Sequence, residues 1–343
     1  MRADRRPSVR AGFLAVLASF LALLAAGVFG YVRRPLLPSS GVKPPAGVDP
    51  VRLERHVRRL ASSLPRDWDH PEALDRVAAY IKRELEASGG RLSEQVYGVP
   101  WWDQRNRKVV KGPFRNVIAV FGPDSEERLV VGAHYDAFGP FPAADDNASG
   151  VAALLELARL LGAEPPAMRV DLAAYTMEEP PLFGTSFMGS AQHAAKLKKE
   201  GVRIRAMIAL EMLGFYSDEP GSQGTPSVLF DLLYPDRGDF IGVVTDHSSR
   251  PLARPIKAAM RGFGLPVYSI TAPPFVQGID YSDHGSFWDQ GYQAAMLTDT
   301  AFLRNKNYHK PTDTPETLDY RRMALATEGA LQAVRALASR RSQ

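Results

Sequence analysis

The stretch from residue 128 to residue 150 constrains the fold more than any other part of this chain. Its first part, 128–133, is a short apolar run with β-branched residues, which suits a buried strand that ends at His134. Asp146 then precedes apolar residues that recur at helical spacing from Val151 onward. A buried strand followed by an amphipathic helix is the building unit of an α/β fold, and side chains at the carboxyl end of such a strand face a ligand-binding crevice.

His134 and Asp146 are therefore candidate metal ligands. Histidine is the commonest nitrogen ligand of zinc, and Asp136 is placed to accept the other ring N–H of His134 and so fix its tautomer. A simpler interpretation is that residues 145–147 only cap a helix and that His134 is a satisfied core histidine. These residues alone leave both interpretations open.

Two later predicted strands also end in acidic residues. The run 170–176 is followed by Glu178 and Glu179, and the run 204–210 is followed by Glu211. Three successive strands that end in ligand-type residues fit the rule that open α/β sheets bind ligands beyond the carboxyl ends of their strands. Of two adjacent carboxylates, one can bind a metal while its neighbour acts as a base on water. A solvated acidic turn is the alternative meaning of the glutamate pair.

The absence of cysteine narrows the chemistry further. It removes disulfides, thiol nucleophiles and cysteine-type zinc sites, so any metal must be bound by His, Asp and Glu. Of the seven histidines, only His134, His284 and His309 follow predicted strands near other polar candidates. We interpret the other four, His56, His70, His193 and His247, as structural. His284 suits a helix-cap network better than a place beside a substrate.

The candidate ligands together provide two nitrogens and three carboxylates. They are His134, Asp146, Glu179, Glu211 and His309. Such a set suits two zinc ions about 3.5–4 Å apart, with one carboxylate bridging them.

Apolar periodicity predicts the remaining elements. Helices are expected at 51–64, 72–87, 188–200, 246–260 and 321–339, and strands at 92–99, 114–121 and 293–298. The polar segment 103–111 is expected to form a hairpin-like connection. The segment 226–240 is either a loop over the site or a surface connection.

Four segments, in this order and spacing, resemble the co-catalytic zinc exopeptidase family, which includes bacterial leucyl aminopeptidases, glutamate carboxypeptidase-type enzymes and glutaminyl cyclases. They are Gly-Ala-His-Tyr-Asp (132–136), Ala-Asp-Asp-Asn-Ala-Ser-Gly (144–150), the glutamate pair (178–179) and Tyr-His-Lys-Pro-Thr-Asp-Thr (308–314). The likeness covers about residues 50 to 340. It implies an α/β fold, a three-layer α/β/α sandwich with a mixed central β-sheet.

The resemblance also implies a role for each site residue. His134 and Glu211 would hold one zinc ion, Glu179 and His309 the other, and Asp146 would bridge them. Three further residues would assist: Glu178 as the general base, Asp136 as the partner of His134, and Tyr308 as a donor to the substrate carbonyl.

The sequence departs from the family pattern at three places. Glu211 stands where most relatives carry Asp, Ala143 replaces a common Gly, and Pro180 and Pro181 replace small or acidic residues. The longer side chain of Glu211 puts the occupancy of its metal site in question. We interpret the departures as marks of a membrane-bound bacterial subgroup.

The N-terminal region has a different character from the rest of the chain. Residues 12–32 carry no charge and, as a helix of about 31 Å, would match the hydrocarbon core of a bilayer. We expect a basic cytoplasmic N-terminus (1–11), an uncleaved transmembrane anchor (12–32), a linker (33–50) and a zinc peptidase domain (51–343).

The charges around this span predict its orientation. Four arginines precede it and two follow closely, so the positive-inside rule places the catalytic domain outside the cytoplasm. Secretion after signal cleavage is the alternative. The formal charge of +4 comes from this region, because residues 1–34 carry +5 and leave −1 for the remainder. Nucleic acid is therefore excluded as a partner.

The sequence thus predicts a metal-dependent aminopeptidase that acts on peptides through a water activated by two zinc ions. A glutaminyl cyclase-like zinc enzyme and a catalytically inactive ectodomain that binds a partner are the alternatives. No Gly-x-Ser-x-Gly or His-Glu-x-x-His motif occurs, which disfavours serine hydrolase and single-zinc protease chemistry.

Overall fold

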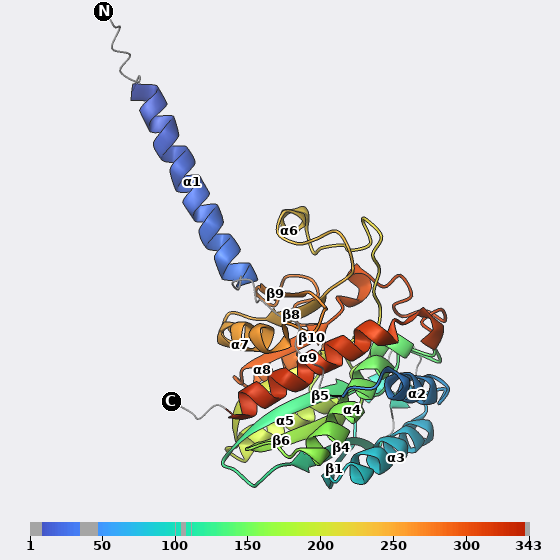
Figure 1. The fold of residues 1–343 in the computed structure, drawn as a ribbon. Helices are drawn as coiled ribbons and strands as arrows, with labels where there is room; N and C mark the ends of the chain where they lie inside the picture. The colour runs from blue at the N-terminus through green and yellow to red at the C-terminus, as the bar shows by residue number, and fades with distance from the viewer. Residues whose placement is uncertain (1–8, 35–46, 100, 104–107, 111, 340–343) are drawn as a thin grey trace, which may run out of the picture.

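A mixed sheet of eight strands organises the protein (Figure 1). In spatial order the strands are β1 (Arg91–Tyr97), β4 (Phe114–Phe121), β6 (Arg169–Tyr175), β5 (Glu127–His134), β7 (Arg203–Glu211), β10 (Ala294–Thr298), β8 (Ile241–Thr245) and β9 (Val267–Thr271). β5 pairs in parallel with β6 and β7, and β7 pairs in parallel with β10. This computed structural model describes residues 9–34, 47–99, 101–103, 108–110 and 112–339.

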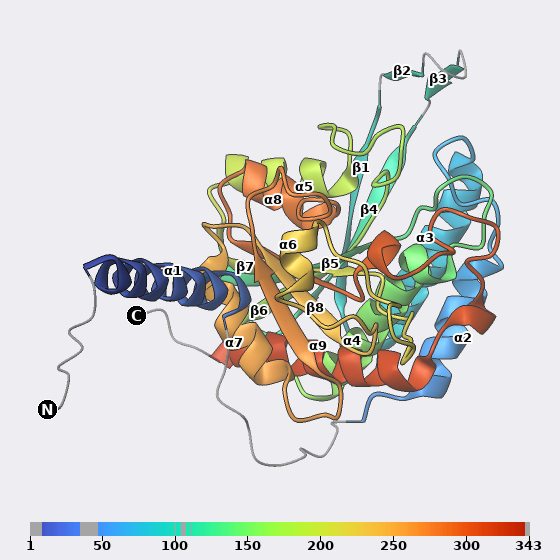
Figure 2. The same cartoon turned by 90° about the horizontal axis from the view of Figure 1, so that it is seen from above.

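Helices cover both faces of the sheet, which makes the three-layer arrangement expected from the sequence (Figure 2). On one face lie α2 (Pro50–Ala61), α3 (Pro71–Ala87), α4 (Gly150–Ala163), α7 (Arg250–Met260) and α9 (Tyr320–Ser339). On the other lie α5 (Gly189–Lys199) and α8 (Asp283–Asp289). Because β5 and β7 are buried on both sides, their sequences are nearly continuous apolar runs.

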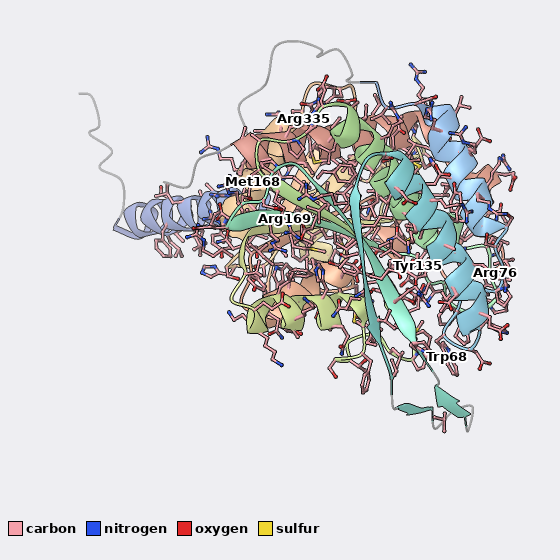
Figure 3. The ribbon with its side chains drawn as sticks, turned by 90° about the horizontal axis from the view of Figure 1, so that it is seen from below. Trp68, Arg76, Tyr135, Met168, Arg169 and Arg335 are labelled. Atoms are coloured by element: carbon pink, nitrogen blue, oxygen red, sulfur yellow. The ribbon has the colours of Figure 1, made fainter. Side chains whose placement is uncertain are left out.

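The end of β5 is tied to the neighbouring part of the fold. Tyr135, the residue after this strand, donates its hydroxyl to the carbonyl of Arg115 on β4 at 2.7 Å. α3 packs along β4 and β1 at the same edge of the sheet (Figure 3). These contacts hold the strand end that carries His134 in a fixed position.

The predicted elements occur close to their expected places, and the sheet has two additional strands. β2 (Trp101–Asp103) and β3 (Lys108–Val110) pair antiparallel, which agrees with the hairpin predicted for 103–111; residues 104–107 and 111 lie outside the described residues. β8 and β9 were not predicted. Each has only five residues, and β8 pairs antiparallel with β10, which extends the sheet beyond its parallel centre.

The N-terminal segment forms α1 (Val9–Arg33), which projects from the domain (Figure 1). The helix expected over 12–32 is therefore confirmed. Within the residues that the structure describes, however, no helix meets the combined length and apolarity needed to cross a membrane. The structure does not support the transmembrane part of the prediction. Most of the expected linker, 35–46, lies outside the described residues.

Candidate metal centre

The candidate ligands meet at one edge of the sheet, beyond the carboxyl ends of its parallel strands. His134 is the last residue of β5 and Glu211 the last residue of β7. Glu178 and Glu179 follow β6 by a few residues, and Asp146 lies at the kink of the short segment η1 (Ala144–Ser149), just before α4. Because parallel neighbours end at the same edge, residues distant in sequence become adjacent.

His309 completes this group from a later loop. It lies between the short helices η2 (Ala301–Leu303) and η3 (Pro315–Thr317). Its ring is sandwiched between Phe138, at a centroid distance of 4.1 Å, and Tyr308, at 3.8 Å, and both rings are nearly parallel to it. The stacking fixes the imidazole, so its Nε2 is held toward the carboxylates.

Two three-residue clusters share Asp146. In the first, His134 Nε2 lies 3.4 Å from Asp146 Oδ1 and 3.4 Å from Glu211 Oε2. In the second, His309 Nε2 lies 3.1 Å from Asp146 Oδ2. The same nitrogen lies 3.1 Å from Glu179 Oε2. Asp146 therefore presents one oxygen to each cluster, as a bridging carboxylate does.

These distances fit metal coordination. Ligand atoms about 2.0–2.1 Å from a tetrahedral zinc ion stand roughly 3.3 Å from one another. His309 Nε2 and Glu179 Oε1 are buried and make no hydrogen bond within the described residues. Buried polar atoms normally have a partner, so unpaired atoms at ligand spacing point to a bound cation. The residues present thus fit two metal ions.

Glu178 stands beside the first cluster. Its Oε2 lies 3.7 Å from His134 Nε2, and it forms a third possible metal-binding group with His134 and Glu179. The carboxylate is buried, and burial raises its pKa well above the usual range. A carboxylate with a raised pKa suits proton transfer near neutral pH.

The electrostatics of the site show an excess of buried negative charge. Burial raises the pKa of Glu179 to about 8, and the neighbouring carboxylate of Asp146 adds to that shift. Burial alone would lower the pKa of His309, but the carboxylates of Asp146 and Glu179, each 3.1 Å from its Nε2, raise it to about 10. The cluster therefore holds protons tightly where no cation neutralises it, and protons and metal ions compete for the same atoms.

Asp136 lies next to the site but in a different contact from the one expected. Its Oδ1 is 3.6 Å from His134 Nδ1, which is within ion-pair range and longer than a hydrogen bond. Its two oxygens instead accept the backbone N–H groups of Glu178 and Glu179, at 3.2 and 3.0 Å. Asp136 thus fixes the backbone that carries the base and ligand candidates.

Glu211 is held by two side chains that the sequence analysis did not select. Ser282 donates its hydroxyl to Glu211 Oε2 at 2.7 Å, and Asn147 Nδ2 lies 3.3 Å from the same oxygen. Asn147 also accepts the backbone N–H groups of Gly150 and Met212. The longer arm of this glutamate is therefore aimed at His134 by fixed donors.

Two further buried residues, also missed from the sequence, support the loop between His134 and Asp146. Arg66 is fully buried and donates to the carbonyls of Tyr135, Leu60, Pro142 and Ala143. Asp313 accepts the backbone N–H groups of Asp145 and Asp146. Asp313 falls inside the 308–314 motif and was within reach of sequence reasoning, whereas no local pattern distinguishes Arg66.

The other histidines lie away from the clusters. His284 Nε2 donates to the carbonyl of Ile279 at 2.7 Å, which agrees with a cap network. His56 bonds with Tyr80, His70 with Asp67, His193 with Tyr175, and His247 with Tyr31. Tyr308 stacks on His309, and its role toward a substrate carbonyl stays a prediction.

A pocket with a mostly apolar lining opens beside Glu211. Aromatic rings from several elements form much of its lining: Tyr234, Phe240, Tyr268, Tyr281 and Phe302. Two of these rings, Tyr234 and Phe240, come from the 226–240 segment, so this segment borders the site and is more than a surface connection. Glu211 is the charged residue of the lining, so the pocket offers an apolar space with one acidic end.

Comparison with known proteins agrees with this geometry. The model of peptidase family M28 matches residues 116–334. The chain is 44% identical over 297 residues to YfbL of Escherichia coli strain K12, which covers 84% of this chain and 88% of that protein. It is 26% identical over 303 residues to leucine aminopeptidase 1 of Ajellomyces capsulatus strain G186AR, covering 80% of this chain and 72% of that one.

Solved structures show the same fold. LapB from Legionella pneumophila superposes with a TM-score of 0.64 at 20% identity, covering 85% of this chain and 73% of that one. The glutaminyl cyclase of Bacteroides thetaiotaomicron superposes with a TM-score of 0.64 at 18% identity, covering 85% and 99%. The family match includes every candidate metal ligand, and the chain belongs to peptidase family M28.

Proposed function

We propose that this protein is a zinc-dependent aminopeptidase that removes the N-terminal residue of peptides. The observation that carries the proposal is the pair of clusters joined by Asp146, with the free carboxylate of Glu178 beside them. His134, Glu211 and Asp146 would hold one zinc ion, and Asp146, Glu179 and His309 the other. Zinc ions bound there would polarise the scissile carbonyl and lower the pKa of a water molecule.

Other side chains of the protein would transfer protons and hold the site in place. Glu178 would accept the proton of the attacking water and deliver it to the leaving amine. Asp136 would hold the backbone of Glu178 and Glu179 in position, because it accepts hydrogen bonds from both of their N–H groups. Stacking on Phe138 and Tyr308 would hold His309 in place through the cycle.

The apolar pocket supports a substrate with an apolar first residue. Apart from Glu211, whose charge a bound metal ion would neutralise, its lining carries no charged side chain. An apolar side chain complements such a surface. Action at the amino end of the peptide is supported by a relative by sequence, which is named leucine aminopeptidase 1.

The test is a substrate panel on the purified full-length chain. Leucyl-, alanyl- and N-acetyl-leucyl-aminomethylcoumarin are assayed after chelation and after zinc is restored, with bound zinc measured in parallel. We expect turnover of the two free amines, loss of turnover on chelation, and recovery with zinc. Turnover of the blocked substrate alone, or inactivity of a zinc-loaded protein, would contradict an aminopeptidase.

Glutaminyl substrates separate the alternative from this proposal. A cyclase releases ammonia from a glutaminyl peptide and leaves the peptide bond intact, whereas an aminopeptidase releases glutamine. Mass spectrometry of the products distinguishes the two outcomes. Formation of pyroglutamyl peptide without release of the first residue would favour the cyclase.

A further inference from the structure

The last residue of α1 rests on the outer side of the apolar pocket. The guanidinium carbon of Arg33 lies 4.8 Å from the ring centroid of Tyr268 and 5.3 Å from that of Tyr234. Both rings line the pocket beside Glu211. Tyr268 belongs to β9, whereas Tyr234 belongs to the long connection before β8, so one cation joins two separate parts of the wall.

A second set of contacts receives the carboxyl end of the helix. The carbonyl oxygen of Arg33 accepts the Nζ of Lys257 at 2.8 Å and the Oγ of Ser269 at 2.7 Å. Lys257 is only 5% exposed, and burial lowers its pKa to about 8. Within the described residues it has no carboxylate in ion-pair range. The partial negative charge at the end of a helix therefore takes the place of an acidic partner for a buried ammonium.

Neighbouring residues add to the same contact. The guanidinium carbon of Arg250 lies 4.2 Å from the ring centroid of Tyr31, and the Tyr31 hydroxyl is hydrogen-bonded to His247. Arg34 donates to the carbonyl of Arg250 at 3.4 Å. These contacts involve α7 and the residues just before it (Figure 1). The end of α1 is thus seated on a surface built from buried and aromatic side chains.

Hydrogen bonds connect the carboxyl end of α1 to the wall of the pocket. The Tyr234 hydroxyl donates to the carbonyl of Ser269 at 2.8 Å, and Ser269 also bonds Arg33. The connection that carries Tyr234 is otherwise weakly packed: in its short helix α6 (Val228–Asp231) Val228 is 75% exposed, and the adjacent Leu232 is 86% exposed. Arg33 therefore ties an exposed connection to the sheet.

We propose that the carboxyl end of α1 positions the wall of the substrate pocket, with Arg33 holding Tyr234 against Tyr268 so that the pocket fits a large apolar first residue. The proposal rests on the function proposed above for the metal centre. Arg33 and Lys257 are positioning residues, because they act through the two tyrosines and touch no reacting atom.

The kinetic test compares Arg33→Ala with Arg33→Lys in the full-length chain. Arg254→Ala is the matched control, because it removes an exposed arginine from α7 without touching either tyrosine. We expect Arg33→Ala to raise KM for phenylalanyl- and leucyl-aminomethylcoumarin about 5- to 20-fold, the loss of contacts to two rings. The KM for the alanyl substrate, kcat and bound zinc should stay at parental values, and Arg33→Lys should recover part of the loss.

A binding test makes the inference independent of turnover. The probe is 2-phenylethylamine, an apolar ring with a free amine that no peptidase can hydrolyse, and its affinity is measured by calorimetry. Weaker binding to Arg33→Ala than to Arg254→Ala supports the proposal even if no peptide is cleaved, in which case only the peptidase assignment fails. Equal binding and equal KM in the two variants would refute it.

Seating of the helix end can be measured directly because the chain contains no cysteine. The pair Tyr31→Cys and His247→Cys, treated with a short bis-maleimide, should form an intramolecular cross-link. The pair Leu17→Cys and His247→Cys, with one cysteine about four turns earlier on α1, should not. Two labelled but unlinked thiols in the first pair would show that α1 is not seated, which also overturns the proposal.

Discussion

Replacing Glu178 by Gln tests whether Glu178 is the general base and its neighbour Glu179 the metal ligand. The substitution keeps the size of the side chain and the backbone N–H that Asp136 accepts at 3.2 Å. It removes the negative charge of the Glu178 carboxylate, whose Oε2 lies 3.7 Å from His134 Nε2. If Glu178 is the base, kcat should fall by about 10²–10⁴-fold, or roughly 3–5 kcal/mol in the barrier, with KM and bound zinc nearly unchanged.

Replacing Glu179 by Gln should have the opposite pattern. Its Oε2 lies 3.1 Å from His309 Nε2, inside the cluster shared with Asp146. An amide there is a weaker ligand than a carboxylate, so zinc should be lost and activity should recover partly at high zinc concentration. Although both carboxylates lie close to His134, only that of Glu179 belongs to the cluster of Asp146 and His309.

The assay is zinc stoichiometry by atomic absorption beside kcat and KM on a leucyl substrate. Glu200→Gln, on the exposed end of α5, is the matched control for loss of one negative charge and should match the parent. Loss of zinc from Glu178→Gln with full occupancy in Glu179→Gln would show that the roles are reversed. Loss of zinc from both would place Glu178 among the ligands.

Three further predictions follow from the site and its surroundings. Glu211→Ala should weaken zinc binding at one site while Glu211→Asp keeps partial activity, and a titration that finds two equally tight sites in the Ala variant would exclude this ligand. Asn147→Ala should lower the free energy of unfolding by about 2–5 kcal/mol in urea titrations, because it leaves the buried backbone N–H groups of Gly150 and Met212 unpaired. An unchanged urea midpoint would contradict this prediction. Burial lowers the pKa of His56, His193 and His284 to about 4, so the unfolded chain binds their protons first as the pH falls below 6.5. Each of these histidines should therefore lower the free energy of unfolding by about 2 kcal/mol at pH 5. His193→Phe should reduce the difference between the urea midpoints at pH 7.5 and pH 5. An unaltered difference would contradict the predicted loss of stability at acidic pH.

α1 forms where the charge-free run predicts a helix, and its exposed leucines match the apolar composition of that run. The described residues include no helix fit to cross a membrane, so the predicted anchor is unsupported. The cellular location of the domain stays a prediction.

Local sequence patterns were sufficient to predict the central elements and to select candidate ligands, whose roles came from the family resemblance. β5, β6 and β7 are mostly apolar because they are buried on both faces, and each ends in a ligand-type residue or is followed by one. His134, Glu179 and Glu211 could be selected for this reason. The periodicity of the flanking helices is equally local, since each helix buries one stripe of its own surface against the sheet.

Tertiary structure alone decided the contacts that cross the chain. β8 and β9 were not predicted, and their pairing with β10 and with each other depends on strands distant in sequence. Ser282 aims Glu211 from 71 residues away, and no local pattern marks a serine for that task. Composition and spacing limit which residues can act as ligands, whereas the packing of distant segments determines which atoms stand close enough to share a metal ion or form the wall of a pocket.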